Sequence, residues 1–524
     1  MSALGNRRSA LARGILLLPV GLVLAGVGVP VGYLLLRAFE AEPAELADLV
    51  LRGRTLVLLL NTLGLAAGVL ALGSTLAFPL AWLVTRTDLP AKGAVTLLGV
   101  LPLAVPGYVM AYALLGLGGD VGVAARLFGL AVPRPSGYVG ALLALSLYTF
   151  PYLFLNLRAA LLGLDPAQEE AARSLGLSPT AVARQVVLPH LRPAFSAGAL
   201  LVGLHVLGDF GAVSLMRFET ISYALYLQYA AAYDRTYAAW LALLGLALAA
   251  LALLAEARAL RGLRLARTGS GAARRPRALP LGPWRWPAFG FVGLVGLAGV
   301  GVPVGTLTYW LLRGTEVAVG GRLGEALGNA VLASAPAAVL AAALALPLAV
   351  LGVRRAGPMS RAVERVAYLG YATPPLAFAL ALVFFSLRAA PALYQTLGLL
   401  VVAYALHFLA EALGPVRSAL YQAPPRLEEA ARILGRSRLG AFFSATFPLL
   451  RRGLATSAAF VFLACLKELP ITFLLSPVGF DTLALRVWGY ASEALFGAAA
   501  PYALAIVACS AAFVGLLLNQ EAAP

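Results

Sequence analysis

The chain contains many apolar runs of 20 or more residues, and this feature limits its fold more than any other. Because a helix rises ~1.5 Å per residue, a run of this length crosses the ~30 Å hydrocarbon core of a bilayer. Of the 524 residues, 61% are hydrophobic and only 12% are charged, which is about half the charged fraction of an average soluble domain. These properties exclude a soluble enzyme, a disordered chain and a secreted disulfide scaffold. We therefore predict an all-α integral membrane protein.

The apolar runs predict about 12 transmembrane helices. The expected spans are residues 14–38, 55–84, 93–118, 137–163, 193–215, 236–257, 286–312, 325–352, 362–388, 395–420, 453–475 and 496–519. Each is long enough to cross the bilayer as a helix.

Basic residues are concentrated in short segments between the apolar runs. The net charge is +17, from 40 basic and 23 acidic residues. A nucleic-acid site would gather basic side chains on one soluble face with aromatic residues between them, so this distribution indicates a topology signal instead. With the N-terminus inside, 28 basic residues fall in cytoplasmic segments and 11 on the opposite side, and Lys467 lies within a span. The positive-inside rule thus predicts that both termini are cytoplasmic.

The chain is an internal duplication. The sequence LAGVGVPVG of residues 24–32 returns unchanged at 297–305, and a longer loop motif also occurs twice. Because each copy holds six spans, both copies insert in the same orientation. The predicted organisation is a first transmembrane repeat at 1–257, a basic cytoplasmic linker at 258–285 and a second transmembrane repeat at 286–524.

The loop after the fourth span of the first repeat is too regular for a plain connection. Asp165 is placed to cap a helix that has Pro166 at its first position. Gly176 is placed to end that helix in the left-handed conformation, and Ser178 offers the cap of a second short helix. We call residues 165–190 the first docking loop, because a helix–Gly–helix unit outside the membrane is suited to a partner's groove.

The second repeat has the same pattern in residues 424–449, the second docking loop. Pro425 opens its first helix, Gly435 ends it and Ser437 begins the next one. A proline is predicted to close each loop: Pro189 in the first and Pro448 in the second. Two such loops predict a partner with two matching grooves.

Both loops resemble the EAA loop of binding-protein-dependent ABC importer permeases. That family's pattern is Glu-Ala-Ala, three residues, Gly, nine residues, Ile, one residue and Leu-Pro. The first loop matches it at Glu170, Ala171, Ala172, Gly176, Leu188 and Pro189, with Val186 at the Ile position. The second loop matches at Glu429, Ala430, Ala431, Gly435 and Pro448, but has Ala445 and Phe447 at the apolar positions.

The resemblance extends over nearly the whole chain and is greatest to the fused ferric-iron importer permeases. The similar stretches are residues 207–215, 466–472 and 480–484. A thiamine importer permease has the same size and duplication but lacks the Lys-Glu-Leu-Pro stretch of residues 467–470. Permeases for thiamine or another substrate remain the alternative.

The resemblance implies a type I ABC importer permease fold in the cytoplasmic membrane of a bacterium. It also implies two ATPase subunits that bind the docking loops and a periplasmic binding protein that delivers the substrate. The two lysines of the chain, Lys92 and Lys467, do not lie in a Gly-Lys-Ser/Thr phosphate-binding motif. We therefore expect no enzyme activity and no cofactor on this chain, with ATP and Mg²⁺ bound by the partner ATPases.

Ionisable residues inside spans are costly and are candidates for a transport role. Asp209 and Glu468 occupy equivalent positions in the outer third of the fifth span of each repeat. The hypothesis is that they line an external vestibule where a hard cation meets carboxylate oxygens. The alternative is a structural hydrogen bond. Pro470 removes a backbone donor beside Glu468 and is a third pathway candidate.

Two histidines lie four residues before a carboxylate on a predicted helix. These pairs are His205 with Asp209 and His407 with Glu411. Each pair could bind a metal, but a carboxylate more often orients a buried imidazole, and two ligands are too few for a stable site. No metal site is therefore predicted.

A secondary transporter is the competing functional class, because twelve spans in two parallel halves also suit it. Against it, residues 85–92 lack the Gly- and Arg-rich signature of the major facilitators, and intramembrane charges are few.

Overall fold

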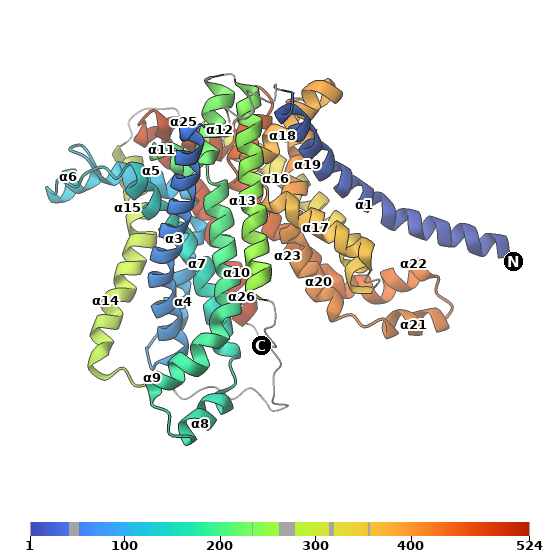
Figure 1. Cartoon of the computed structure of the whole chain (residues 1–524), viewed down its shortest axis with the longest axis horizontal. Coiled ribbons are helices and arrows are strands. Elements are labelled where there is room, and N and C mark those ends of the chain that lie inside the picture. The colour runs from blue at the N-terminus through green and yellow to red at the C-terminus, as the bar shows by residue number, and fades with distance from the viewer. Residues whose placement is uncertain are drawn as a thin grey trace. The chain divides into compact units, whose positions relative to one another are not determined.

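The computed structural model describes residues 2–40, 52–232, 234–260, 278–313, 319–354 and 357–522. Over these residues the chain forms helices joined by short loops (Figure 1). Nine of the helices are long and apolar enough to span a membrane, and the number rises to 12 when three bent helix pairs are each counted as one span. The prediction of an all-α membrane protein with about 12 spans is confirmed.

The chain divides into two compact units that do not follow the order of the sequence. Unit 2 contains residues 52–224, 247–319 and 487–524, and unit 1 contains residues 1–51, 225–246 and 320–486. The helices of unit 2 are α3 (Gly53–Arg86), α4 (Lys92–Val100), η1 (Leu101–Ala104), α5 (Gly107–Leu117), α6 (Val123–Phe128), α7 (Gly137–Gly163), α8 (Pro166–Ser174), α9 (Pro179–Val182), η2 (Ala183–Val187), α10 (Leu188–Gly208), α11 (Gly211–Leu215), η3 (Gly282–Trp284), α14 (Arg285–Gly296), η4 (Leu297–Gly301), α15 (Val302–Arg313) and α26 (Phe496–Ala522).

Unit 1 consists of most of the second repeat and the first helix of the chain. Its helices are α1 (Ser2–Ala38), α16 (Val319–Arg354), α17 (Pro358–Ala372), α18 (Pro375–Ala389), η5 (Pro391–Leu393), α19 (Leu397–His407), α20 (Leu409–Tyr421), α21 (Arg426–Ile433), α22 (Arg438–Ala441), η6 (Phe442–Thr446), α23 (Phe447–Leu466) and α24 (Pro470–Leu475). Apart from the first residue of α16, which falls in unit 2, three further helices are divided between the units: α12 (Ile221–Ala230), α13 (Arg235–Ala259) and α25 (Leu483–Ser492).

The first helix of each repeat packs in the unit formed by the other repeat. Helix α1 packs against α17, α18 and α19 of the second repeat, whereas α14 and α15 pack against α4 and α5 of the first. Within the duplicated LAGVGVPVG segment, a Cβ on Gly26 would lie 2.5 Å from Leu406, and a Cβ on the equivalent Gly299 would lie 2.8 Å from Pro102. Glycine therefore permits the close helix approach at the same position of both copies.

An ion-pair cluster holds the far end of α1. The carboxylate of Glu40 pairs with Arg37 and, at 2.7 Å, with Arg388 of α18. Hydrogen bonds and charge from Arg37 and then Arg388 lower the pKa of Glu40 below its ordinary value, against a smaller opposing effect of burial.

Three predicted spans are sharply bent. The two parts meet at 94° around Pro106, at 106° around Pro374 and at 54° between α19 and α20. The first two breaks agree with the prolines that the sequence places in the third span of each repeat, since proline lacks the backbone donor. The break after His407 has no proline and gave no sequence signal.

The end of the linker is hydrogen-bonded to the loop that follows α3. Leu279 donates its N–H to the carbonyl of Arg86 at 2.8 Å, and Asp88 donates its N–H to Leu279 at 3.1 Å. The carboxylate of Asp88 accepts the N–H of Leu281 at 2.9 Å. Residues 261–277, which form most of the predicted linker, lie outside the described residues.

Candidate docking site

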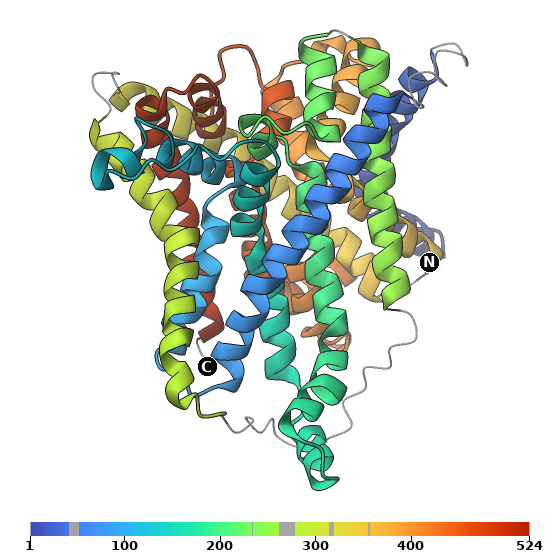
Figure 2. The ribbon, with the colours of Figure 1, turned by 60° about the vertical axis from the view of Figure 1, so that its left-hand side comes forward.

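The first docking loop folds as two short helices at one end of unit 2, where α8 and α9 project beyond the long helices (Figure 2). The carboxylate of Asp165 accepts the N–H of Ala167 at 3.0 Å, and the hydroxyl of Ser178 accepts the N–H of Ala181 at 3.3 Å. Gly176 lies between the helices with φ +86°. These local features agree with the capping and left-handed turn predicted from the sequence.

The second docking loop repeats this arrangement in unit 1 with α21 and α22. Pro425 precedes the first residue of α21, and Gly435 has φ +85°. The Ser437 hydroxyl caps α22 by accepting the N–H of Gly440 at 3.1 Å.

The prediction that a proline closes each loop is wrong. Pro189 and Pro448 lie in the first turns of α10 and α23, and the helix continues into them through one wide π-turn. In the first loop, Leu188 donates to the carbonyl of Ala183, five residues earlier. Because the wider turn changes the usual hydrogen-bond pattern just before the proline, its missing N–H does not break the helix. The second helix of each docking loop, α9 or α22, is thus continuous with a membrane-spanning helix.

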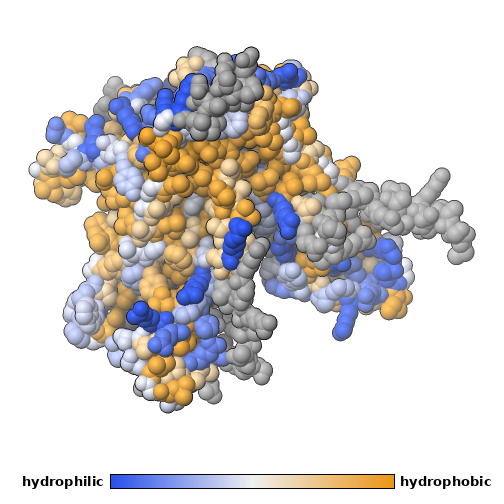
Figure 3. All heavy atoms as spheres, viewed as in Figure 1, coloured by the Kyte–Doolittle hydropathy of each residue, from blue (hydrophilic) through white to orange (hydrophobic). Residues whose placement is uncertain are grey.

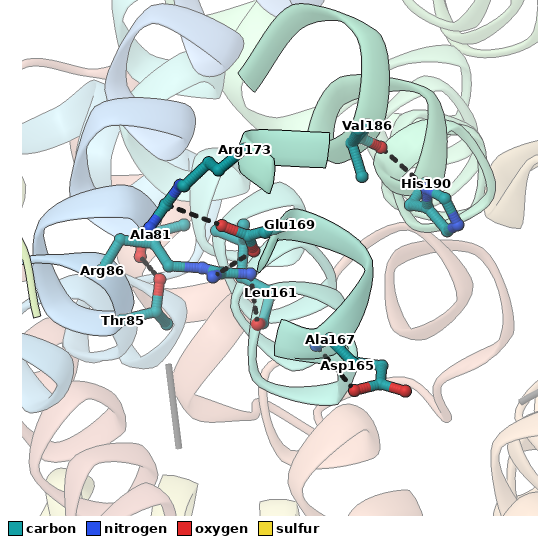
Figure 4. A network of polar contacts seen from close by, with 10 residues as sticks. All are labelled: Ala81, Thr85, Arg86, Leu161, Asp165, Ala167, Glu169, Arg173, Val186 and His190. Atoms are coloured by element: carbon teal, nitrogen blue, oxygen red, sulfur yellow. Dashed lines mark hydrogen bonds and ion pairs between the residues drawn. The ribbon is translucent and has the colours of Figure 1, made fainter. Parts of the chain in front are cut away.

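A buried ion pair attaches the first docking loop to two spans. Arg86, the last residue of α3, donates to Glu169 of α8 at 2.6 Å and to the carbonyl of Leu161 of α7 at 3.1 Å (Figure 4). The side chains of Arg86 and Glu169 are 4% and 10% exposed. Arg173 approaches the same carboxylate at 3.5 Å. The network joins α3, α7 and α8 at one point.

The second repeat contains an equivalent ion pair. Arg354, the last residue of α16, pairs with Glu428 of α21, and the hydroxyl of Thr446 donates to the same carboxylate. Sequence reasoning missed both pairs. The available signal was a basic residue at the end of the second span and a second glutamate before the Glu-Ala-Ala motif in both repeats.

The residues predicted to contact a partner are mainly on the surface of these loops. The exposed ones are Glu170, Ala171, Gly176, Leu188, Glu429, Ala430, Gly435 and Pro448, whereas Pro189 and Ala431 are half-buried and Ala172 is buried. Next to each glycine is an exposed leucine that the sequence analysis did not single out: Leu175 is 83% exposed and Leu434 is 84% exposed. Apolar side chains exposed at equivalent positions of two loops indicate contact surfaces.

The pathway candidates lie where the fifth span of each repeat is interrupted. Asp209 follows α10 and accepts the N–H groups of Ala212 and Val213, both at 3.0 Å, at the start of α11. Glu468 follows α23 in the same way and accepts the N–H groups of Ile471 and Thr472 at 2.9 and 3.0 Å. Pro470 is the first residue of α24. Both carboxylates therefore cap short helices, and their contribution to a transport pathway stays a prediction.

The imidazole of His205 in the first repeat is hydrogen-bonded to other groups of the protein. Its Nε2 lies 3.1 Å from the hydroxyl of Tyr152 and its Nδ1 lies 2.8 Å from the carbonyl of Leu201. Among the residues that the structure describes, no group of three or more His, Cys, Asp or Glu side chains is arranged to hold a metal ion.

The described residues form a duplicated set of membrane-spanning helices with a helix–turn–helix loop in each repeat, which is the architecture of a multi-pass membrane protein. The family described as "binding-protein-dependent transport system inner membrane component" matches residues 70–261 and 335–522, and the chain belongs to this family. It is thus the permease component of an ABC transport system. A secondary transporter does not agree with this membership.

Similar proteins include iron, molybdenum and sulfate permeases. Fe(3+)-transport system permease protein FbpB 2 of Haemophilus influenzae is 32% identical over 512 residues, which are 96% of this chain and 97% of that protein. A probable molybdenum ABC transporter permease protein of Haloferax volcanii is 30% identical over 46% of this chain and 88% of its own length. The sulfate transport system permease protein CysT of Salmonella typhimurium is 34% identical over 26% of this chain and 49% of its own.

Proposed function

We propose that this permease translocates ferric iron, delivered by a periplasmic binding protein and driven by two ATPase subunits on the docking loops. The iron assignment is supported by similarity that covers both repeats of an Fe(3+)-transport permease, whereas the molybdenum and sulfate relatives match half of this chain or less. Ferric iron would be the cargo and not a resident metal.

The observation that carries the ATPase proposal is the pair of docking loops. Each presents an exposed leucine and an exposed glutamate, Leu175 with Glu170 and Leu434 with Glu429. Each is also fixed by an ion pair to the end of a membrane-spanning helix. A partner that moves the loops would therefore move α3 and α16 with them. ATP and Mg²⁺ would bind on that partner.

The orientation that follows from the charge distribution places the docking loops and both termini in the cytoplasm. The opposite end of each unit would then face the periplasm of a bacterial inner membrane.

The substrate is tested by ATP hydrolysis in the reconstituted complex. The permease is placed in lipid vesicles with its ATPase, and the binding protein is added loaded with ferric iron, thiamine or molybdate. Stimulation by the iron-loaded form alone is the expected result. Stimulation by another loaded form would retain the importer and contradict the iron assignment.

The docking sites are tested by Leu175→Asp and Leu434→Asp, singly and together. Because a charge on the contact surface opposes burial against the partner, each change should weaken ATPase binding by tenfold or more. The matched control is Val478→Asp in the loop between α24 and α25, since Val478 is 87% exposed and lies outside both docking loops and outside the helices. Unchanged ATPase binding by the double variant would place the partner elsewhere.

A further inference from the structure

The first repeat carries an extra segment, residues 118–136, which we call the outer loop. It joins α5 to α7 with 19 residues, whereas the equivalent connection from α18 to α19 has seven, residues 390–396. It lies at the end of unit 2 opposite α8 and α9, with α6 projecting sideways (Figures 1 and 2). Because the second repeat folds with the shorter connection, the fold itself does not require this length.

The outer loop is a fixed structure. Its base is closed by a hydrogen bond of 2.8 Å from the N–H of Gly119 to Val132. The guanidinium of Arg134 donates to the carbonyl of Gly118 at 3.3 Å and lies over the ring of Phe496 at 5.7 Å. Gly129 ends α6 in the left-handed conformation, with φ +65°. These contacts hold the backbone at the base of the loop and at the end of α6.

Apolar side chains cover the projecting part of this loop. The exposed fractions are 48% for Val121, 55% for Leu127, 69% for Phe128 and 58% for Leu130. The space-filling view shows apolar atoms gathered there beside a few hydrophilic ones (Figure 3). Water is a poor environment for four such neighbours on a loop that the protein holds in place.

Two tryptophans indicate that the base of the loop lies at the depth of a membrane interface. Trp286 and Trp310 are 24 residues apart at opposite ends of the α14–α15 span, which corresponds to about 36 Å along a helix. This distance slightly exceeds the ~30 Å hydrocarbon core, and tryptophan prefers the two interfaces. The indole of Trp310 donates to the carbonyl of Gly116, two residues before the outer loop, at 3.2 Å.

We propose that the outer loop is an interfacial anchor that inserts into the lipid leaflet at the end of unit 2 opposite the first docking loop. Val121, Leu127, Phe128 and Leu130 enter the boundary between headgroups and acyl chains, continuous with the lipid-facing surface of α15. The exposed Arg126 of α6 meets lipid phosphates, and the exposed Asp120 stays in water. Lipid is favoured over a soluble partner because the apolar group lies at interface depth and extends sideways from α5.

The proposal is tested by spin-label depth measurement in nanodiscs of phosphatidylethanolamine and phosphatidylglycerol. Cys465 and Cys509 are first replaced by alanine, and a nitroxide is attached to Phe128→Cys. Collisions with oxygen, which concentrates in lipid, are compared with collisions with a nickel chelate, which stays in water. Reference labels are Leu294→Cys on α14, 61% exposed within a span, and Glu170→Cys on the first docking loop.

At position 128 we expect oxygen collisions to exceed nickel collisions, with a ratio between those of the two references. Equal or greater nickel access would place the loop in water and overturn the proposal. Protection from nickel that appears only after addition of the binding protein would also overturn it, because the occupant would then be a protein. A second label at Leu130→Cys should give the same order, so the result does not depend on one variant.

Discussion

At the scale of single residues, two neighbouring glutamates in each docking loop differ in burial and in ion pairing. Glu169 is buried against Arg86, while Glu170, the next residue, is exposed. The same division separates Glu428, which pairs with Arg354, from the exposed Glu429. One glutamate of each pair thus holds the loop to the spans, while the other is exposed, where the proposed ATPase could reach it.

Replacing Arg86 by methionine should loosen the first docking loop. Glu169 would keep only the distant Arg173, so the loss is about 2–3 kcal/mol, somewhat less than for a fully isolated buried charge. Amide hydrogen exchange in α8 should therefore accelerate by roughly 30–150-fold. The control is Arg173→Met, whose partner distance is 3.5 Å and whose side chain is 47% exposed; it should cost less than about 1 kcal/mol. Equal effects of the two changes would contradict this account.

The variants Asp209→Asn and Glu468→Gln test whether these carboxylates only cap the short helices α11 and α24 or also contribute their charge to transport. Asp209→Asn keeps the single oxygen that accepts both N–H groups at the start of α11, so thermal stability should change little, whereas Asp209→Ala should cost about 1 kcal/mol. Glu468→Gln keeps one of the two oxygens that accept the N–H groups of Ile471 and Thr472, so it should also cost about 1 kcal/mol. If the carboxylates line the pathway, iron uptake falls in both amide variants by more than these small losses of stability explain. Normal uptake by the double amide variant would exclude the pathway role and leave only the caps.

At the scale of elements, the helix caps and the left-handed turn of the docking loops were predictable from the sequence. Asp165, Gly176 and Ser178 act on residues two to four positions away, so their spacing contains the needed information. The Arg86–Glu169 pair joins residues 83 positions apart, and no local pattern indicates it. The spans were also predictable from apolar length, but the bend after His407 was not, because no proline or glycine lies there.

Gly176→Ala should destabilise the turn of the first docking loop. A Cβ at this position meets no atom within 4 Å, so the cost comes only from φ +86° and is about 1–2 kcal/mol. Faster hydrogen exchange in α8 and α9 is the expected measurement. The matched control is Gly163→Ala at the end of α7, which also meets no atom but lies in a helix and should not destabilise. Gly176→Asn should fall between the two.

At the scale of the whole molecule, the sequence repeats and the compact units differ. Duplication was evident from LAGVGVPVG, yet nothing in that sequence tells which repeat its helix packs against. Lipid-facing and helix-facing surfaces are both apolar, so hydropathy does not distinguish the partners. The exchange of α1 and α14–α15 is evident only in the structure, where Gly26 lies against Leu406 and Gly299 lies against Pro102.

Cutting the chain within residues 261–277 should give two halves that need each other. Neither half contains all helices of a compact unit, because α1 belongs with the second repeat and α14, α15 and α26 belong with the first. Co-expressed halves should purify together through a tag on one of them, and each half alone should aggregate or be degraded. Separate purification of two stable monomers would contradict the exchange.

Because the first helices are exchanged between the repeats, α1 must wait during synthesis for the helices against which it packs. Helix α1 leaves the ribosome well before its partners, because α17, against which it packs, begins about 320 residues after α1 ends. At ~5–20 residues per second, α1 waits roughly 15–60 s for its partner. Throughout that interval the surface around Gly26 must be covered by lipid or by a helper of the insertion machinery. Helix α1 therefore docks late, after the other helices of the first repeat have been made.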